Sequence, residues 1–234
     1  MHHAKYAKNR ICRGNPLWLP CSLFMIDLLV ATTNQGKLAE VQAFLKSLPL
    51  RMVSLRELAN APAVIEDGAT FEANALKKAR TLAQFSSLLT LADDSGIEVD
   101  ALGGRPGIFS ARYCGAEGND DANNQKLLRE LANVPDEKRT GRFVCALALC
   151  APTGDGLKEW TLRDSCEGRI AFALTGSNGF GYDPLFFYPP FGKTFGEIDR
   201  ETKASVSHRG KALKKLAEML PTWVDLAVEL PPQP

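Results

Sequence analysis

Two adjacent carboxylates, Asp93 and Asp94, follow a short apolar run and precede Ser95 and Gly96. Carboxylates set against apolar sequence are costly unless a cation compensates them. Side chains that are neighbours on an extended chain point to opposite faces, so the two acids need not share one task. One of them could accept a proton from water or hold a metal ion. The alternative interpretation is a capped turn with both acids in solvent.

A polar turn separates an earlier apolar run from a helical pattern. Its residues are Thr32, Thr33, Asn34, Gln35, Gly36 and Lys37. A turn that leads into a helix presents unpaired backbone N–H groups, which suit anions. Gly36 allows close approach of the backbone and Lys37 adds a positive charge, but the Walker A pattern GxxxxGK[ST] is absent. The turn is either a phosphate-binding loop of another kind or a helix cap with a solvated lysine.

The segment 177–184 places aromatic residues between glycines, in the order SNGFGYDP. Glycines let a backbone fold closely around a flat ligand. Phe180 or Tyr182 could stack on a nucleobase for about 1–3 kcal/mol. The alternative is a glycine turn whose aromatic side chains pack into the core.

A basic segment, 203–210, contains Lys203, His208 and Arg209. Ser207 can cap the last expected helix, which places His208 and Arg209 in its first turn. Cations there oppose the helix dipole, so the placement suggests a use, such as donating hydrogen bonds to a ligand rich in acceptors. The alternative is that both side chains reach into solvent.

The composition excludes several classes of protein. The chain has 234 residues, 45% hydrophobic and 24% charged, which is typical of one soluble globular domain of about 200 residues. With 28 basic and 27 acidic residues the net charge is +1, so no overall positive field is available to hold DNA or RNA. No apolar run of about 18 residues is present, so we expect no membrane-spanning segment.

The cysteines and histidines favour a reduced compartment and a hard metal. None of the six cysteines forms a CxxC pair, and two lie in an apolar run that is expected to be a buried strand. We therefore expect a cytoplasmic protein without a disulfide framework. His208 is the only histidine outside the extreme N-terminus, so any metal should be held by carboxylates, as magnesium is.

Hydrophobic periodicity predicts the elements that must position these residues. The expected strands are 26–32, 51–54, 88–92, 97–100, 142–150 and 158–170; the expected helices begin near 38 and after 119, and cover 70–85 and 207–220. Such a mixture indicates a three-layer α/β domain, with helices flanking a mixed sheet. Each polar stretch then stands where a strand ends, which is where ligands collect in open α/β sheets.

The two ends differ from the body. Residues 1–24 contain basic residues and prolines but no acid, and Met25 immediately precedes the first expected strand. We expect 1–24 to be a disordered extension or to lie before the true start at Met25. Residues 25–221 are expected to form a single domain, followed by a C-terminal tail at 222–234.

Five motifs occur in a specific order and spacing. They are LLVATTNQGKLAEV (28–41), EDGATFEANALKKA (66–79), LADDSGIEVDALGGRPGIFSARY (91–113), GFGYDPLFF (179–187) and KASVSHRGKAL (203–213). Together they resemble one family, the inosine/xanthosine triphosphate pyrophosphatases of the Ham1/RdgB type, which act on noncanonical purine nucleoside triphosphates. The resemblance covers nearly the whole body of the chain.

The resemblance implies hydrolysis of ITP, dITP and XTP to the monophosphate and pyrophosphate, a requirement for Mg2+, a homodimer, and an elongated α/β fold with two lobes around a cleft. It implies that the turn 32–37 holds the triphosphate and that Ser95 contacts substrate. Asp94 would be the catalytic acid, drawing a proton from the water that attacks the α-phosphorus, and would hold the metal with Glu66. The residues around the base and sugar would be Phe180, Gly181, Tyr182, Asp183, Lys203, His208 and Arg209.

The chain departs from the family pattern in three places. Thr33 stands where the family's first loop usually has glycine, so the turn cannot depend on a positive φ there. Ala73 stands where glutamate is common in the TFxENA motif. Glu66 and Asp67 are both candidates for the upstream metal ligand, and Glu66 is the preferred one.

Two other functions are compatible with parts of the sequence. A Maf-type nucleotide pyrophosphatase would share the general architecture, but the SHR and FGYD segments argue against it. A nucleotide-binding sensor without catalysis is the other alternative, and the presence of Lys37, Asp94, Lys203 and His208 argues against that.

Overall fold

A computed structural model describes residues 25–115 and 118–228 of the chain. The expected N-terminal extension, 1–24, and the last residues of the expected tail, 229–234, lie outside the described residues.

The centre of the molecule is a seven-stranded mixed sheet in the order β2-β1-β3-β4-β5-β6-β7. Its strands are β1 (Ile26–Val30), β2 (Leu50–Ser54), β3 (Leu89–Val99), β4 (Thr140–Thr153), β5 (Gly156–Ile170), β6 (Phe186–Tyr188) and β7 (Lys193–Thr194). β1 pairs in parallel with both β2 and β3, and every later pairing is antiparallel. The predicted mixed sheet is therefore confirmed.

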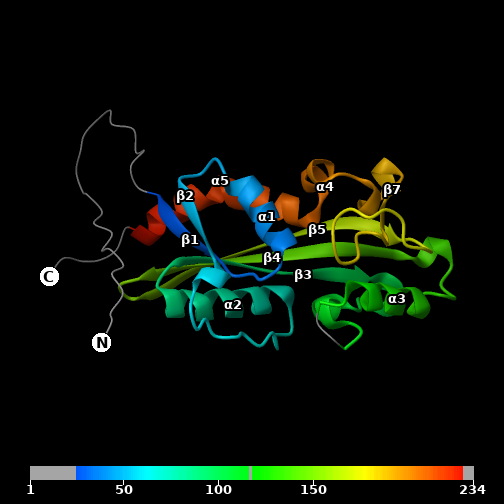
Figure 1. Ribbon diagram of the computed structural model, residues 1–234, viewed down its shortest axis with the longest axis horizontal. Coiled ribbons are helices and arrows are strands. Elements are labelled where there is room, and N and C mark those ends of the chain that lie inside the picture. The colour runs from blue at the N-terminus through cyan, green and yellow to red at the C-terminus, as the bar shows by residue number, and fades with distance from the viewer. Residues whose placement is uncertain (1–24, 116–117, 229–234) are drawn as a thin grey trace.

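Helices cover both faces of this sheet, which gives the predicted three layers (Figure 1). One face carries α1 (Gln35–Leu45), α4 (Arg200–Val206) and α5 (His208–Val228); the other carries α2 (Phe71–Ser86) and α3 (Asp120–Glu130). Strand β4 is mostly buried because helices lie above and below it, so its sequence from Phe143 to Pro152 is apolar instead of alternating.

The buried side chains form three apolar clusters, and these divide the domain into two lobes. In the first lobe, one cluster packs α1 and α5 on the sheet, and a second packs α2 on the opposite face. The third cluster fills the other end of the molecule, where α3 and the segment around β6 meet the far ends of β4 and β5. The elongated shape in Figure 1 follows from this end-to-end arrangement.

The carboxyl end of β1 is the topological switch point of the sheet. The chain leaves β1 through α1 to reach β2 on one side, then returns through α2 to β3 on the other side. Helices α1 and α2 therefore lie on opposite faces of the sheet, and the chain order reverses between β1 and β3. Ligands bind at such switch points in open α/β sheets.

One expectation about a single element is wrong, and one helix was not predicted. The stretch from Asp93 to Gly96 does not end a strand: β3 is continuous, and this stretch pairs with β4. It lies beside the end of β1 instead, since the pairing of β1 with β3 stops at Leu91. Polar residues can continue a central strand here because cations compensate their charge, as described below. Helix α4, which carries Lys203, was not foreseen.

The last helix passes beyond the expected domain boundary at residue 221. It continues to Val228, and Trp223 is buried against Trp160 of β5, with ring centroids 5.5 Å apart. The first part of the expected tail is therefore a packed helix.

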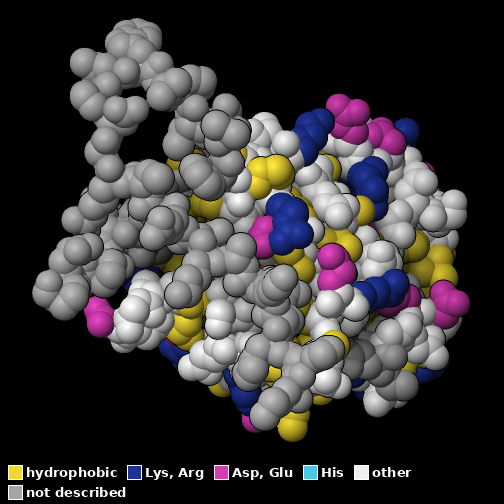
Figure 2. Space-filling model, turned by 60° about the vertical axis from the view of Figure 1, so that its left-hand side comes forward, with side chains coloured by type: hydrophobic (Ala, Val, Ile, Leu, Met, Phe, Trp, Pro, Cys, Tyr) yellow, Lys and Arg dark blue, Asp and Glu magenta, His cyan; other side chains and the backbone are white. Residues whose placement is uncertain are grey.

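The visible surface carries charges of both signs. In Figure 2 basic and acidic side chains are interspersed on the part of this face that is not grey. No helix among the described residues is long and apolar enough to cross a membrane. Among the described residues, Cys145, Cys150 and Cys166 are buried free thiols.

Candidate active site

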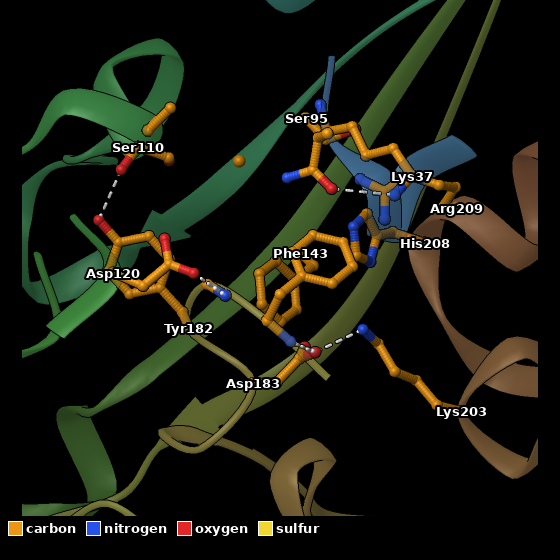
Figure 3. A pocket seen from close by; sticks show the side chains of 15 residues that line it. Lys37, Ser95, Ser110, Asp120, Phe143, Tyr182, Asp183, Lys203, His208 and Arg209 are labelled. Atoms are coloured by element: carbon orange, nitrogen blue, oxygen red, sulfur yellow. Dashed lines mark hydrogen bonds and ion pairs between the residues drawn. The ribbon is translucent and has the colours of Figure 1, made fainter. Parts of the chain in front are cut away.

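A cavity opens between the two lobes, next to the carboxyl end of β1. It is lined by Asn34, Lys37, Ser95, Gly96, Ser110, Ala111, Asp120, Phe143, Phe180, Gly181, Tyr182, Asp183, Lys203, His208 and Arg209. Figure 3 shows the basic side chains on one side of it, and Ser110, Asp120 and Tyr182 on the other. All four polar stretches found in the sequence thus meet here, with Ser95 and Gly96 representing the stretch that contains Asp93 and Asp94.

Asp93 is the central carboxylate of the cationic side of this cavity. It accepts from Lys37 Nζ of α1, from Arg209 Nε of α5 at 2.8 Å, and from Ser95 Oγ at 2.8 Å. Burial alone would raise the pKa of Asp93, but the charges of Arg209 and Lys37 outweigh it and hold the pKa well below its usual range. Asp93 is therefore ionised at neutral pH and fixes both cations.

Asp94 points to the opposite face of β3, as alternation along a strand requires. Its side chain lies 3.9 Å from Lys78 Nζ of α2, and that ammonium donates to Glu66 Oε1 at 2.8 Å. Burial raises the pKa of Asp94 to about 6, against the opposing charges of Lys78 and Lys37. Asp94 Oδ2 is buried without a hydrogen-bond partner among the described residues. The two neighbouring acids therefore have different surroundings and different chemistry.

Asp94 does not line the cavity, but the next two residues of β3, Ser95 and Gly96, do. Beyond Leu91, β1 no longer pairs with β3, so this edge of β3 has no strand beside it at Asp93 and Asp94. The electrostatic effect of Lys37 on the pKa of Asp94 reflects the same proximity. A ligand with a long anionic tail can lie in the cavity and reach around the end of β1 towards Asp94.

The turn after β1 contributes unequally to the cavity. Of its six residues only Asn34 and Lys37 line it. The Asn34 side chain caps α1 by accepting from Lys37 N at 3.0 Å, and the Thr32 hydroxyl accepts from Asn34 N at 3.2 Å. Thr33 and Gln35 are exposed. The helix cap and the phosphate-binding interpretation are thus compatible, because the capped start of α1 faces the cavity.

Thr33 causes no backbone strain. Among the described residues other than glycine, only Asn60 and Ser87 have a positive φ. The turn therefore keeps its shape without the glycine that is usual in the family at this position.

The aromatic segment forms the opposite wall of the cavity. Tyr182 is buried and its hydroxyl donates to Ser110 O at 2.8 Å. The Asp183 carboxylate accepts from Phe180 N at 2.9 Å and from Lys203 Nζ at 2.5 Å, which folds the segment back on itself. One face of the Phe180 ring is directed towards cations, with Lys203 Nζ 4.8 Å from the ring centroid.

The three basic residues are not in solvent, so that alternative is wrong. Lys203, His208 and Arg209 are all at least 95% buried, with relative exposures of 5%, 3% and 1%. Ser207 caps α5 as predicted, because its Oγ accepts from Gly210 N at 3.1 Å. Glu40 of α1 binds Arg209 Nη1 at 2.8 Å and lies 3.7 Å from Lys203 Nζ. Paired acids are what permit these cations to be buried.

His208 is neutral in this setting. Burial lowers its pKa well below the usual value, and the charges of Arg209 and Lys203 lower it further. Its ring stacks on Phe143 with centroids 4.6 Å apart, and its Nδ1 is buried without a hydrogen-bond partner among the described residues. It offers a ligand one donor and one acceptor, and no charge.

Comparisons with known proteins identify the family to which the chain belongs. The Ham1 family matches residues 28–219. A dITP/XTP pyrophosphatase from Geobacter sulfurreducens is 50% identical over 196 residues, which cover 84% of this chain and 97% of the relative. This chain belongs to the Ham1 family.

Solved structures of Ham1 proteins share the fold. That of a HAM1 protein from Coxiella burnetii has a TM-score of 0.77 and 38% identity, covering 85% of this chain and 100% of that one. The Ham1 protein of Staphylococcus aureus gives a TM-score of 0.75 at 36% identity, covering 84% and 99%.

Several residues of the site in this Ham1 chain were not predicted from its sequence. They are Glu40, Lys78, Asp93 in its role as ion-pair partner, Ser110, Asp120 and Phe143. Glu40 follows Lys37 by three positions and so shares its helical face, which was a usable signal. Lys78 follows the expected metal ligand Glu66 within a quoted motif. For Ser110 and Phe143 no local signal exists, because only long-range packing brings them to the cavity.

Gly36 lies directly against the ring of Phe180. A Cβ there would lie 2.7 Å from two atoms of the Phe180 ring. Gly36→Ala therefore displaces Phe180, and we expect KM for ITP to rise about tenfold, as loss of about one base stack requires. Steady-state kinetics measure this, with Gln42→Ala on the exposed side of α1 as the control. An unchanged KM would contradict the role of this contact.

Proposed function

We propose that the chain hydrolyses ITP, dITP and XTP to the nucleoside monophosphate and pyrophosphate. One observation carries the proposal: a buried carboxylate with a raised pKa, Asp94, lies around the end of β1 from a cavity with cations at one wall and aromatic rings at the other. The spacing suits a molecule with a flat ring at one end and an anionic tail at the other. The names of the relatives, dITP/XTP pyrophosphatases, support the same substrates.

Base selection follows from the donors on the cationic wall. Inosine and xanthine carry a carbonyl at position 6, whereas adenine carries an amino group. Lys203 and Arg209 are held in place by Asp183, Glu40 and Asp93 and can only donate hydrogen bonds. A carbonyl satisfies such donors and an amino group does not, so the site should discriminate strongly against ATP.

Mg2+ fits the residues near Asp94. Asp94 Oδ2 is a buried oxygen without a hydrogen-bond partner among the described residues, and the Glu66 carboxylate shares the Lys78 ammonium with Asp94. Asp67 instead pairs with Lys77 in solvent, so the geometry favours Glu66. Within the described ranges no three His, Cys, Asp or Glu residues cluster. Mg2+ is suited to this, because it is often bound by one or two carboxylates plus substrate phosphates.

The proposed reaction is an attack of water on the α-phosphorus. Asp94 accepts the proton of that water, and its raised pKa makes it a better base than an ordinary aspartate. Lys37, Lys78 and the start of α1 stabilise charge on the phosphates and on the leaving pyrophosphate. When bound by Glu66 and Asp94, Mg2+ would neutralise phosphate charge. Positioning and electrostatics carry most catalysis of this type.

The alternatives have weaker support. The curated relatives with about half of their residues identical are dITP/XTP pyrophosphatases, which disfavours a Maf-type activity. A sensor without catalysis would not need a carboxylate kept at a raised pKa at the end of β1. We also propose that the enzyme is cytoplasmic and that it forms a homodimer. Light scattering in solution tests the homodimer.

Pyrophosphate release from a panel of nucleotides with Mg2+ tests the proposed function. We expect kcat/KM for ITP and XTP to exceed that for ATP by at least about 100-fold, since the site leaves its donors unpaired with adenine. GTP shares the carbonyl at position 6, so its rate measures what position 2 contributes. Equal rates for ITP and ATP would refute the base-selection argument, and release of single phosphates would refute the reaction.

A further inference from the structure

We propose that Asp120 and Asn124 of α3 are positioning residues that hold Gly181 and thereby set Phe180 against the base of the substrate. The inference deepens the proposed function and rests on it. Asp120 and Asn124 form a clamp on the aromatic segment 177–184. These two residues lie outside the five motifs quoted above.

Both backbone groups of Gly181 are bound by α3. Asp120 Oδ2 accepts from Gly181 N at 2.7 Å, and Asn124 Nδ2 donates to Gly181 O at 2.9 Å. Asp120 and Asn124 are four residues apart, so they share one face of the helix. Figure 3 shows Asp120 beside Tyr182, on the side of the cavity opposite Lys203 and Arg209.

The aromatic segment needs an external hold. Gly179 and Gly181 both have positive φ, at +78° and +62°, and glycine gains the most freedom when a contact is lost. Other contacts hold the two ends of the segment: Asn178 N donates to Gly196 O at 2.9 Å, and Lys203 Nζ of α4 donates to the Asp183 carboxylate. The Tyr182 hydroxyl is bound to Ser110 O. The bonds from α3 are the ones that hold the backbone of Gly181 itself.

Helix α3 is a firm base for the clamp. Its first turn is capped by Asn119, whose side chain accepts from Ala122 N at 3.0 Å. Buried Asn123 accepts from Cys114 N at 2.7 Å and donates to Ala111 O at 3.2 Å. At the far end, Arg139 Nη1 donates to Leu131 O at 2.6 Å. The helix is thus tied to the second lobe along its whole length.

The clamp transmits this rigidity across the cavity. The Phe180 ring packs on Gly36 of α1 and faces Lys203 and Arg209, while the next residue, Gly181, is tied to α3. Phe180 is therefore held between the lobes by its neighbour. Loss of the clamp should release Phe180 while leaving Asp94 and its surroundings unchanged, so base recognition falls and chemistry does not.

Kinetics with Asp120→Ala test the proposal, with Asp121→Ala as the matched control. Asp121 is an exposed acid in the same helical turn, so the control removes the same charge near the helix start. We expect Asp120→Ala to raise KM for ITP about tenfold, with kcat within about twofold, because a hydrogen bond to a charged group is worth about 1.4 kcal/mol or more. KM for ATP should rise by a similar factor, because stacking on an aromatic ring does not distinguish one purine from another.

Conservative variants separate positioning from charge and from folding. Asp120→Asn keeps an acceptor oxygen and should restore most of the lost affinity for ITP. Asn124→Ala removes the second bond and should raise KM for ITP without touching any charge. An unchanged KM for ITP in both alanine variants would overturn the proposal, and so would an Asp120→Asn variant as impaired as Asp120→Ala.

Hydrogen exchange gives a readout that needs no substrate. The segment 177–184 should exchange about tenfold faster in Asp120→Ala than in Asp121→Ala. Equal exchange would overturn the clamp even if the wild type cleaves ITP. If the two variants differ in exchange but the wild type releases no pyrophosphate from ITP, only the proposed function is refuted.

Discussion

Asp94→Asn is expected to lower kcat for ITP about 1,000-fold while KM changes little. The substitution removes the group that accepts the proton of the attacking water, and general-base catalysis contributes about 10²–10⁴-fold. Asp94 also does not line the cavity that would hold the base, so ground-state binding should survive. Near-normal turnover in this variant would refute the catalytic assignment.

The same variant should be more stable than the wild type at pH 7.5 without metal. Burial raises the folded-state pKa of Asp94 from about 3.8 to about 6, so the folded protein prefers the protonated acid. Stability is therefore lost as pH rises from the unfolded-state pKa to the folded-state pKa, and this loss is complete above pH of about 6. Two pKa units correspond to about 2–3 kcal/mol, which a neutral amide recovers.

Urea unfolding in a chelator measures this gain, at pH 7.5 and near pH 4. The gain should be present at pH 7.5 and small near pH 4, where wild-type Asp94 is protonated. Asp67→Asn is the control, because Asp67 lies in solvent and pairs with Lys77. A wild type that is more stable than Asp94→Asn at pH 7.5 would contradict the raised pKa.

Asp93→Asn is expected to have the opposite effect and to lower the free energy of unfolding by about 3–5 kcal/mol. It would leave Arg209 without its partner at Nε and Lys37 without its carboxylate, and both cations are largely buried. Breaking a buried pair on one side costs this much because a charge remains uncompensated. The pKa of Asp93 is well below its usual value, so its contribution is complete at neutral pH and is lost only at strongly acidic pH.

The two neighbours form their own control, since both substitutions are isosteric and remove one charge from adjacent positions of β3. Thermal melts of both variants at pH 7.5 in a chelator should shift in opposite directions. A shift of both in the same direction would mean that the two side chains do not have the separate environments described above.

The sequence predicted most elements because helix and strand periods report which face is buried. The apolar spacing of Leu38, Val41 and Leu45 predicted α1, and the unbroken apolar run from 143 to 150 predicted a central strand. The predicted strand boundaries within β3 were wrong for a physical reason. The stretch from Asp93 to Gly96 would interrupt the strand only if its two carboxylates were solvated. The cations that allow these carboxylates to be buried come from α1, α2 and α5, which are distant in sequence.

The residue types and their order were therefore enough to indicate an α/β enzyme fold of this family, a candidate base at Asp94 and a basic and aromatic binding site. Only the tertiary structure decided that Asp93 and Asp94 are buried in a continuous strand, that Lys203, His208 and Arg209 are buried, and that α3 holds Gly181. Periodicity is a local property and can be read along one chain segment. Burial of charge and the pairing that compensates it depend on contacts between distant segments, which the fold alone brings together.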